Sequence, residues 1–397
     1  MIHPEQTESC CGCGACAFAC SAGAILMVED EEGFFLPKID PDRCVRCQRC
    51  ESVCPMRNQP HPKAPLAVYA ARSRDEELRR ASSSGGVFSH IAVAVIEKGG
   101  AVYGAAFDKD WRVVHCRADT EVGCRAFRSA KYVQSDMGDC FSRIASDLKA
   151  GRTVLFSGTP CQVAGLHSAL EGTDTSGLVT CDIVCHGVPS PRIWKEYLKL
   201  VSKGSPIRLI SFRDKRHGWH HSELRIVRED GRVLSEHHGK NAYSLLFFNH
   251  YILRPSCARC PFANLSRPGD LTIGDFWGIE KSMPALDDDK GISLVLVNTE
   301  EGKKLLSSIC PALELYPSDP EPCLQPNLMR PSALAPNRGD FWRTYRRHGL
   351  RAAIYIYIYI YIYGWRARLR KALSGFAAPF ARKIKRVILG GTWRDPY

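Results

Sequence analysis

Two runs of cysteines near the N-terminus combine the residue type and the spacing of iron ligands. Both runs read C-x-x-C-x-x-C-x-x-x-C, and they comprise Cys10, Cys13, Cys16 and Cys20, followed by Cys44, Cys47, Cys50 and Cys54. Three thiolates of such a run bind one 4Fe-4S cubane, and the fourth binds the other cluster. Cys54 is therefore expected to complete the first cluster and Cys20 the second. A zinc site closes with four ligands, and a disulfide framework is typical of secreted chains. The spacing thus predicts two 4Fe-4S clusters in a ferredoxin-type module, in which the extra Cys11 is interpreted as a bystander.

Four further cysteines lie at predicted strand ends and in a loop. Cys161 follows a strand expected at residues 153–156, and Cys185 follows one expected at residues 178–184. Ligands bind at the carboxyl ends of the strands of an open α/β sheet, so these two thiols can share one crevice. Cys257 and Cys260 form a C-x-x-C pair, which suits half a zinc site, a redox dithiol or two ligands of another cluster. The alternative for Cys161 and Cys185 is that each is a small buried apolar residue.

A segment of serines and glycines precedes an apolar helix expected at residues 87–98. It reads Ser82-Ser83-Ser84-Gly85-Gly86. A serine N-cap with two glycines would leave backbone N–H groups free at the helix N-terminus, where phosphate groups bind. The alternative is that the segment is only a helix cap. The chain has neither G-x-G-x-x-G nor G-x-x-x-x-G-K-[ST], so neither a Rossmann nucleotide site nor a P-loop is indicated.

The positive charge of the chain is concentrated at its C-terminal end. Residues 338–397 hold 14 Lys and Arg against Asp340 and Asp395, which accounts for the whole net charge of +12. The preceding residues are neutral, so the charge predicts no nucleic acid binding by the folded body. The first nine residues are polar and contain no apolar signal-peptide core. A reducing cytoplasm is therefore expected.

An α+β fold is expected to position these residues. A hairpin is predicted at residues 24–39, strands and helices alternate up to residue 201, and shorter antiparallel strands follow. The predicted helices span residues 87–98, 138–150, 162–170, 192–201 and 300–309. The predicted strands span residues 66–73, 101–107, 153–156, 178–184, 207–212, 224–228, 232–235, 271–274 and 292–298. The predicted domains are a ferredoxin module at 1–58, an α/β domain at 65–204, a second body domain at 205–337 and a basic tail at 338–397.

With these motifs in order, the chain resembles the coenzyme F420 hydrogenase/dehydrogenase beta-subunit family, in the bacterial form that carries an N-terminal two-cluster ferredoxin. The resemblance runs from about Cys10 to about Tyr316. Its carriers, besides the ferredoxin cysteines, are SSSGGVFS (82–89), SAKYVQSD (129–136), FSGTPCQVAGL (156–166), DIVCHGVPSP (182–191), SFRDKRHGW (211–219), RPSCARC (254–260), IGDFWGIEK (273–281) and DDDKGISLVL (287–296).

The resemblance implies a flavoprotein with a mixed α/β flavin-binding body, usually holding FAD. It would pass electrons between clusters and a two-electron partner, which is a deazaflavin in the founding members. The flavin-binding residues that the resemblance implies are Ser82, Ser83, Ser84, Gly85, Gly86, Lys131, Tyr132, Gln134 and Ser135. A flavin in the body needs electrons from the module, so we also predict a third 4Fe-4S cluster. Its expected ligands are the cysteines within the family motifs, Cys161, Cys185, Cys257 and Cys260.

The function expected from these features is that of an iron–sulfur flavoprotein oxidoreductase, because clusters carry single electrons and a flavin exchanges one or two. A redox partner protein or a small electron carrier is implied. One alternative is a non-catalytic electron-transfer or adaptor protein. Another is an acyl-transfer enzyme with Cys161 as nucleophile and His186 as base.

The C-terminal tail combines an Ile/Tyr repeat with a basic segment. Residues 354–363 alternate with period two, which can form a strand, and ten residues are too short to span a bilayer. Residues 365–389 mix Arg and Lys with apolar residues, which suits peripheral contact with the anionic inner membrane surface. A solvated basic tail is the alternative.

Overall fold

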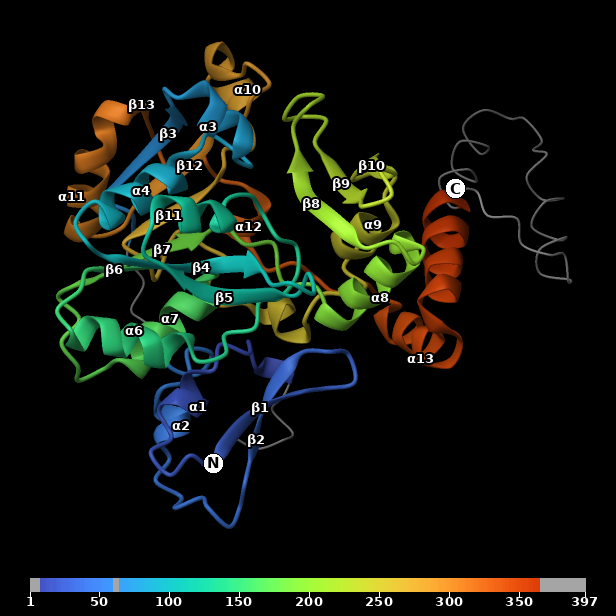
Figure 1. Cartoon of the computed structure of the whole chain (residues 1–397), viewed down its shortest axis with the longest axis horizontal. Coiled ribbons are helices and arrows are strands. Elements are labelled where there is room, and N and C mark those ends of the chain that lie inside the picture. Colours follow the sequence, from blue (N-terminus) through green and yellow to red (C-terminus); the bar gives the residue numbers. More distant parts are fainter. Residues whose placement is uncertain (1–7, 60–63, 365–397) are drawn as a thin grey trace, which may run out of the picture. The chain divides into compact units, whose positions relative to one another are not determined.

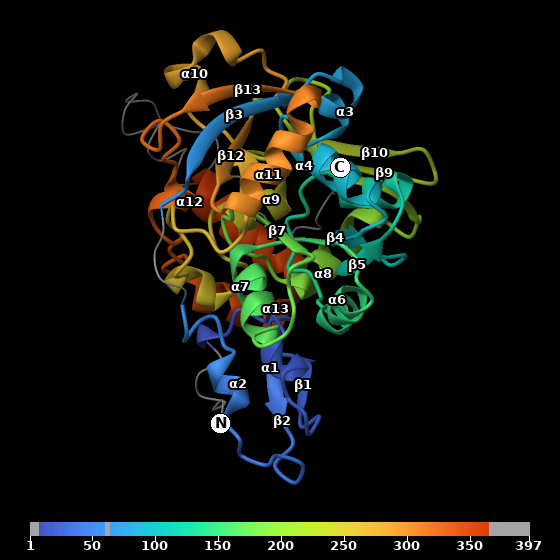
Figure 2. The same cartoon turned by 90° about the vertical axis from the view of Figure 1, so that its left-hand side faces the viewer.

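The structure is a computed structural model that describes residues 8–59 and 64–364 of the chain. The chain forms two compact units, Met1–Arg338 and Gly339–Tyr397. The first unit contains both cysteine runs and the large sheet of the body, and Figure 1 and Figure 2 show it from two sides.

An antiparallel hairpin forms the frame of the N-terminal module. Strand β1 (Ile25–Glu29) pairs with β2 (Phe35–Ile39), which confirms the predicted hairpin. Two one-turn helices, α1 (Ala15–Phe18) and α2 (Arg49–Ser52), lie within the first and the second cysteine run. Both views place the module at one end of the first unit (Figure 1, Figure 2).

One eight-stranded mixed sheet forms the centre of the body. Its strands are β3 (Ala67–Ser73), β4 (Ala101–Phe107), β5 (Val113–Ala118), β6 (Val154–Gly158), β7 (Leu178–Ile183), β11 (Leu271–Asp275), β12 (Ser293–Val297) and β13 (Leu313–Ser318). The strand order is β13-β3-β12-β11-β7-β6-β4-β5. Strands β11, β7, β6 and β4 run parallel, and the outer neighbours pair antiparallel. Strands from both sides of residue 204 belong to this one sheet. The predicted domain limit at residue 204 therefore does not separate two sheets.

Helices cover both faces of the sheet. The helices of the body are α3 (Glu76–Ala81), α4 (Val87–Ile96), α5 (Glu121–Cys124), α6 (Cys140–Lys149), α7 (Pro160–Ala169), α8 (Pro191–Ser202), α9 (Ala242–Phe248), α10 (Ile279–Ser282), α11 (Glu300–Ile309) and α12 (Pro326–Met329). The 3-10 turns are η2 (Arg125–Phe127), η3 (Pro255–Arg259), η4 (Pro284–Leu286) and η5 (Cys310–Ala312). Helices α4 and α11 pack in one core with Val102 of β4, and α6 and α7 pack in another core with the adjacent Tyr103. Successive strand residues point to opposite faces, so the two helix pairs lie on opposite sides of the sheet.

A smaller antiparallel sheet stands beside the large one. Its order is β10-β9-β8, built from β8 (Ile207–Asp214), β9 (Glu223–Arg228) and β10 (Val233–His237). Helices α8 and α9 pack against it through aromatic rings, with centroids 4.8 Å apart between Trp194 and Phe212 and 4.9 Å apart between Trp194 and Tyr243.

Every helix and strand predicted for the first unit is present, with ends that differ by at most two residues. The mixed α+β class with a ferredoxin-type N-terminal module is therefore confirmed. Elements that were not predicted include α3, β5, α9 and β13.

The second unit contains a long helix followed by a π-helical segment. Helix α13 (Arg338–Ile354) bends at Gly349 (φ 79°), and η6 (Tyr355–Tyr363) is a π-helix. The strand considered for the Ile/Tyr repeat is therefore wrong. A lone extended ribbon would leave its backbone N–H and C=O groups unpaired, whereas a helix pairs them within the segment.

Two observations bear on the membrane prediction for the tail. Among the described residues, no helix has the length and apolar character needed to cross a bilayer. The basic segment that was predicted to contact a membrane surface begins at residue 365 and lies outside the described residues.

Candidate redox site

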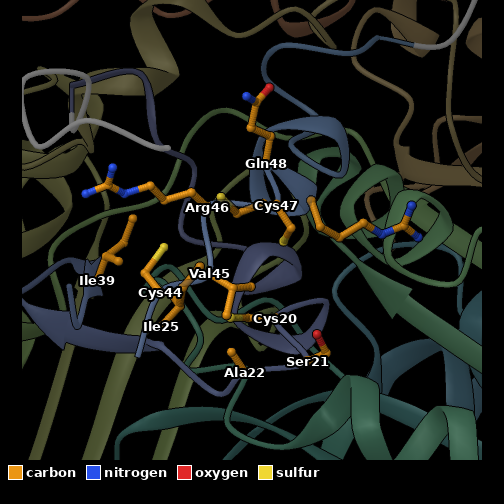
Figure 3. Close-up of a pocket in the computed structure, with 12 residues that line it drawn as sticks. Cys20, Ser21, Ala22, Ile25, Ile39, Cys44, Val45, Arg46, Cys47 and Gln48 are labelled. Carbon is orange, nitrogen blue, oxygen red and sulfur yellow. The ribbon is translucent and has the colours of Figure 1, made fainter. Parts of the chain in front are cut away.

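The fourth cysteine of the first run lies with the second run around one hollow in the module. Cys44, Cys47 and Cys50 line this hollow together with Cys20 (Figure 3). This grouping matches the exchange of the fourth cysteine between clusters that the spacing predicted.

The other four cysteines of the two runs, Cys10, Cys13, Cys16 and Cys54, lie near one another, and Cys13 faces α7. Burial, followed by the neighbouring Cys10 and Cys54, raises the pKa of Cys16 to about 12. Cys13 packs so closely on α7 that a Cβ added to Gly165 would lie 2.8 Å from the Cys13 Sγ. Cys54 thus lies beside the first run. Iron ligation needs thiolates, so cluster assembly here would release protons.

The structure brings together the four body cysteines that were predicted to bind a third cluster. Cys161 lies in the first turn of α7, Cys185 follows β7, and Cys257 and Cys260 lie in and directly after η3. Burial raises the pKa of Cys185 well above its usual value, and the charges of the other three cysteines raise it further. The Val188 N–H donates to the Cys257 Sγ at 3.4 Å, and hydrogen bonds of this kind tune cluster ligands.

The described residues show no site for a single metal ion at these cysteines. In the part of the chain that the structure describes, no three potential ligands converge closely enough to hold one metal ion. The ligands of a cubane each bind a different iron, so they stand apart around the cluster. The absence of a single-ion site therefore leaves the predicted third cluster open.

Cys11 lies between the two cysteine groups. Its thiol is buried and shares one apolar core with Cys13 of the first run and Cys161 of the body. Hydrogen bonding to Cys13, the largest cause, and burial raise the pKa of Cys11, and hydrogen bonding to Cys161 opposes the rise. The residue interpreted as a bystander therefore contacts both cysteine groups.

Arg254 fixes the module to the body beside these cysteines. Its Nε donates to the Cys10 carbonyl at 2.6 Å, and its Nη2 donates to the Phe35 carbonyl at 2.8 Å. Its Nη1 donates to the Gln134 Oε1 at 2.8 Å, and the Gln134 Nε2 donates to the Cys11 carbonyl at 3.1 Å. The side chain of Gln134 is therefore engaged with the module. Sequence reasoning missed Arg254, although it stands three residues before Cys257 in a motif that was singled out.

A cavity of about 970 Å³ lies at the carboxyl ends of β6 and β7, where an open α/β sheet binds its ligands. Its volume is that of a site for a small molecule or cofactor. Of the residues implied for a flavin, the cavity wall contains Ser82, Ser83, Ser84, Gly86, Lys131, Tyr132 and Ser135. Gly85 and Gln134 do not line it. Cys185 is part of the same wall.

The serine segment is held by its own hydrogen bonds. The Ala130 N–H donates to the Ser83 Oγ at 2.7 Å, and the Ser84 Oγ donates to the Ile292 carbonyl at 2.8 Å. The N-cap of α4 is Gly86, in the left-handed region with φ 90°, and no side chain caps the helix. The predicted serine N-cap is therefore wrong, because the hydroxyls of Ser83 and Ser84 fix the loop instead. The first turn of α4 retains uncapped N–H groups at the cavity wall.

The cavity wall is cationic. It contains the basic side chains of Arg128, Lys131, Arg213 and Arg330, and the carboxylate of Asp275 is its one acidic group among the described residues. Burial lowers the pKa of Lys131 to about 7, so this amine titrates near neutrality. A wall of this charge favours an anionic ligand.

Among these cations, Arg213 has buried guanidinium atoms that lack hydrogen-bond partners in the described part of the chain. It is 6% exposed, and its Nη1 lies 3.0 Å from the Asp275 Oδ2. Among the described residues its Nε and Nη2 have no hydrogen-bond partner, and neither has the Nε2 of His238, a second wall residue. Buried polar groups are normally paired, so these atoms indicate a ligand with hydrogen-bond acceptors.

Two histidines meet at another part of the wall. The Nε2 atoms of His186 and His250 lie 2.9 Å apart, and the Nδ1 of His250 bonds the Ala333 carbonyl. A carbonyl only accepts, so His250 carries its proton on Nδ1 and accepts at Nε2 from His186. Burial lowers the pKa of His186 to about 4, and hydrogen bonding with Cys11, followed by burial, raises the pKa of Cys161 well above its usual value. Both shifts oppose a Cys161 thiolate paired with an imidazolium, so they disfavour the acyl-transfer alternative.

Comparisons with known proteins agree with the module and the body. Residues 151–322 match the family model for the C terminus of the coenzyme F420 hydrogenase/dehydrogenase beta subunit, and residues 9–58 match that for a 4Fe-4S dicluster domain. No curated protein matches the chain. A chain of the F420-reducing [NiFe] hydrogenase complex from Methanosarcina barkeri, solved after xenon derivatization, is similar at 19% identity and a TM-score of 0.48. The match covers 66% of this chain and 84% of that chain. The chain is therefore an iron–sulfur electron-transfer protein that matches a 4Fe-4S dicluster domain over residues 9–58 and is related, over residues 151–322, to the C terminus of coenzyme F420 hydrogenase/dehydrogenase beta subunits.

Proposed function

We propose that the chain is an iron–sulfur flavoprotein oxidoreductase. Two clusters of the module and a third cluster on Cys161, Cys185, Cys257 and Cys260 would carry single electrons to or from a flavin in the cavity. The flavin would exchange electron pairs with a donor or acceptor. The observation that supports this most is that Cys185 belongs both to the gathered cysteines and to the cavity wall. A cluster on these cysteines and a flavin in the cavity would therefore be neighbours.

The residues present fit a flavin dinucleotide. Its pyrophosphate carries negative charge, which the cationic wall, the unpaired atoms of Arg213 and the uncapped first turn of α4 would stabilise. Tyr132 and Phe247, whose ring centroids lie 5.1 Å apart, supply apolar surface for an aromatic ring system. The flavin would supply the change between one-electron and two-electron chemistry.

We keep the predicted domain limits at 1–58, 65–204, 205–337 and 338–397 as part of the proposal. The partner is proposed to be a redox protein or a small electron carrier. The hydrogenase complex named among the similar structures makes an assembly of several chains one form of such a partner.

The test is the cofactor content of protein purified and reconstituted without oxygen. We expect about twelve irons per chain and one released flavin, identified as FAD by chromatography. The double variant Cys257→Ser/Cys260→Ser should fall to about eight irons, while the control Cys310→Ser, at an exposed cysteine outside the gathered set, should keep about twelve.

The outcomes separate the proposal from its alternatives. About eight irons in both the native protein and the double variant would remove the third cluster. Protein that stays free of flavin after reconstitution with excess FAD would remove the flavin and favour the non-catalytic adaptor.

A further inference from the structure

The two cysteine runs differ in the residues that accompany their ligands. In the second run an arginine stands directly before each of the first three cysteines, so that residues 43–50 read R-C-V-R-C-Q-R-C. In the first run the neighbouring positions hold Gly12, Gly14 and Ala15, and the run has no basic residue. The small residues allow close packing, and the arginines place three positive charges around one cluster.

The arginine-bearing run is on the surface. Arg43, Arg46 and Arg49 are all exposed, Val45 between them is 69% exposed, and the ligand Cys47 is itself exposed. In Figure 3 the side chain of Arg46 extends away from the hollow. Cys13 and Cys16 of the first run, in contrast, are buried.

The arginines of this loop form no ion pairs within the part of the chain that the structure describes. Arg43 donates from Nη2 to the Ala22 carbonyl at 3.1 Å, and none of the three arginines has an ion pair with a carboxylate of residues 8–59 or 64–364. The nearest acids in sequence, Asp42 and Glu51, flank the loop, Glu51 is paired with Arg57, and residues 43–50 contain no acid. The exposed Val45, Arg46 and Arg49 therefore line the cluster hollow, and Arg43 lies directly before its first cysteine.

The position of the loop is fixed by the hairpin of the module. The turn between β1 and β2 contacts the body, where the Arg192 Nη1 donates to the Glu31 carbonyl at 3.0 Å and the Ser190 Oγ donates to the Glu32 carbonyl. Residues 43–50 follow the opposite end of β2. Together with the buried first run, this orients the second cluster outward.

We propose that residues 43–50 are the docking surface for a small one-electron carrier protein whose own redox centre is surrounded by acidic residues. The carrier would give one electron to the second cluster, or take one from it, and no bond or proton would be exchanged. The arginines would attract the acidic face, and Val45 would lie at the dry centre of the contact. The inference rests on the clusters of the dicluster domain, and it does not need the flavin.

Charge complementarity favours an acidic carrier protein at this surface. Oppositely charged surfaces raise association rates by about 10- to 1,000-fold at low salt, and the effect falls as salt screens the charges. Arginine is also enriched at the centres of protein interfaces, where its planar group pairs with carboxylates.

The test measures reduction of the clusters by stopped-flow absorption in full-length, reconstituted protein. The probes are a reduced acidic 2Fe-2S ferredoxin and reduced methyl viologen, which is a small cation. The variant Arg43→Gln/Arg46→Gln/Arg49→Gln should be reduced by the ferredoxin at least about tenfold more slowly at low salt, with a flatter salt dependence. Reduction by methyl viologen should not slow.

A matched control removes three exposed arginines of the body, Arg112, Arg125 and Arg143. It changes the net charge equally and should keep the native ferredoxin rate. Equal slowing in the control would show a general charge effect and overturn the proposal. Equal slowing with both probes would indicate damage to the cluster and would also overturn the proposal, and iron counts and the redox potential of each variant identify that case.

Arginine-dependent sedimentation with phosphatidylglycerol vesicles, with an unchanged ferredoxin rate, would assign the surface to a membrane instead. Loss of the flavin alone would refute the proposed function and leave these rates unaffected.

Discussion

Arg254 offers the sharpest test of how the module is held. The residue is 2% exposed, and its guanidinium donates to the carbonyls of Cys10 and Phe35 and to the side-chain amide oxygen of Gln134. It also lies 5.3 Å from the centroid of the Phe34 ring. The substitution Arg254→Met keeps most of the side-chain length and removes every donor. Three acceptors at the contact between module and body then lose a charged partner.

The expected cost follows from these contacts. A hydrogen bond from a charged group contributes about 1.5–3 kcal/mol, so three such bonds give roughly 4.5–9 kcal/mol if they simply add. Neighbouring contacts are not additive, and water reaches the acceptors once the module opens, so we expect a cost just below this range, about 4 kcal/mol. Since about 1.4 kcal/mol is a factor of ten in an equilibrium constant, local opening of the module should become roughly a thousandfold more frequent.

Hydrogen exchange measured by mass spectrometry reads this opening directly. Amides of residues 8–39 should exchange faster in Arg254→Met, while those of the body sheet should not. The control Arg259→Met removes an exposed arginine of the same turn, whose partner is the exposed Glu8, and should change exchange by less than about threefold. If the Arg254 variant exchanges within threefold of the native protein, or if both variants behave alike, Arg254 does not hold the module.

Four further predictions follow from single features. Gly165→Val should detach the module or lower the iron count by about four, because even the first added carbon would lie 2.8 Å from the Cys13 Sγ. Arg213→Met should weaken retention of FAD more than that of riboflavin in equilibrium dialysis, since riboflavin has no phosphate. Burial lowers the pKa of His115 to about 4. Below about pH 6.5 this histidine is therefore protonated in the unfolded chain but still neutral in the folded one. Stability measured by urea unfolding should fall from pH 7 to pH 5, and less steeply in His115→Gln. Deletion of residues 365–397 should abolish sedimentation with anionic vesicles if this segment binds membranes, and unchanged sedimentation would reject that binding.

The fold was largely predictable because its elements are local. Strand β4 and helix α4 are strongly apolar and directly follow glycines, and their observed ends lie within two residues of the predicted ones. Strand β5 was missed because its sequence, VVHCRA, carries polar residues. His115 in it is buried because its Nε2 reaches the Ser157 carbonyl of β6 at 3.1 Å, a contact that no local pattern encodes. Helix α3 had a signal that was not used, the Asp75 N-cap whose carboxylate accepts from two backbone N–H groups.

The candidate site was predictable only where sequence spacing carries it. The eight cysteines of the module were identified from their spacing, and the four of the body from the family motifs. Arg254 was not identified, because the residue to which it donates, Cys10, is 244 positions away. Arg213 is likewise recognised only by its burial against Asp275 and its unpaired atoms. Contacts between distant segments depend on the packing of the whole unit.

The local composition of the two cysteine runs nevertheless predicts which of them packs against the body. Cys11 and Ala15 are buried in the core beneath α7, and this close approach requires small side chains in the first run and at Gly165. Arginines could not be accommodated there, because three buried guanidinium groups without partners would each cost several kcal/mol, by the usual penalty for an unpaired buried ion. In the second run the same charges are tolerated because Arg46 and its neighbours are in solvent. The residues between the ligands would therefore decide which cluster faces the body and which faces the proposed carrier, and so the order in which electrons would pass through the module.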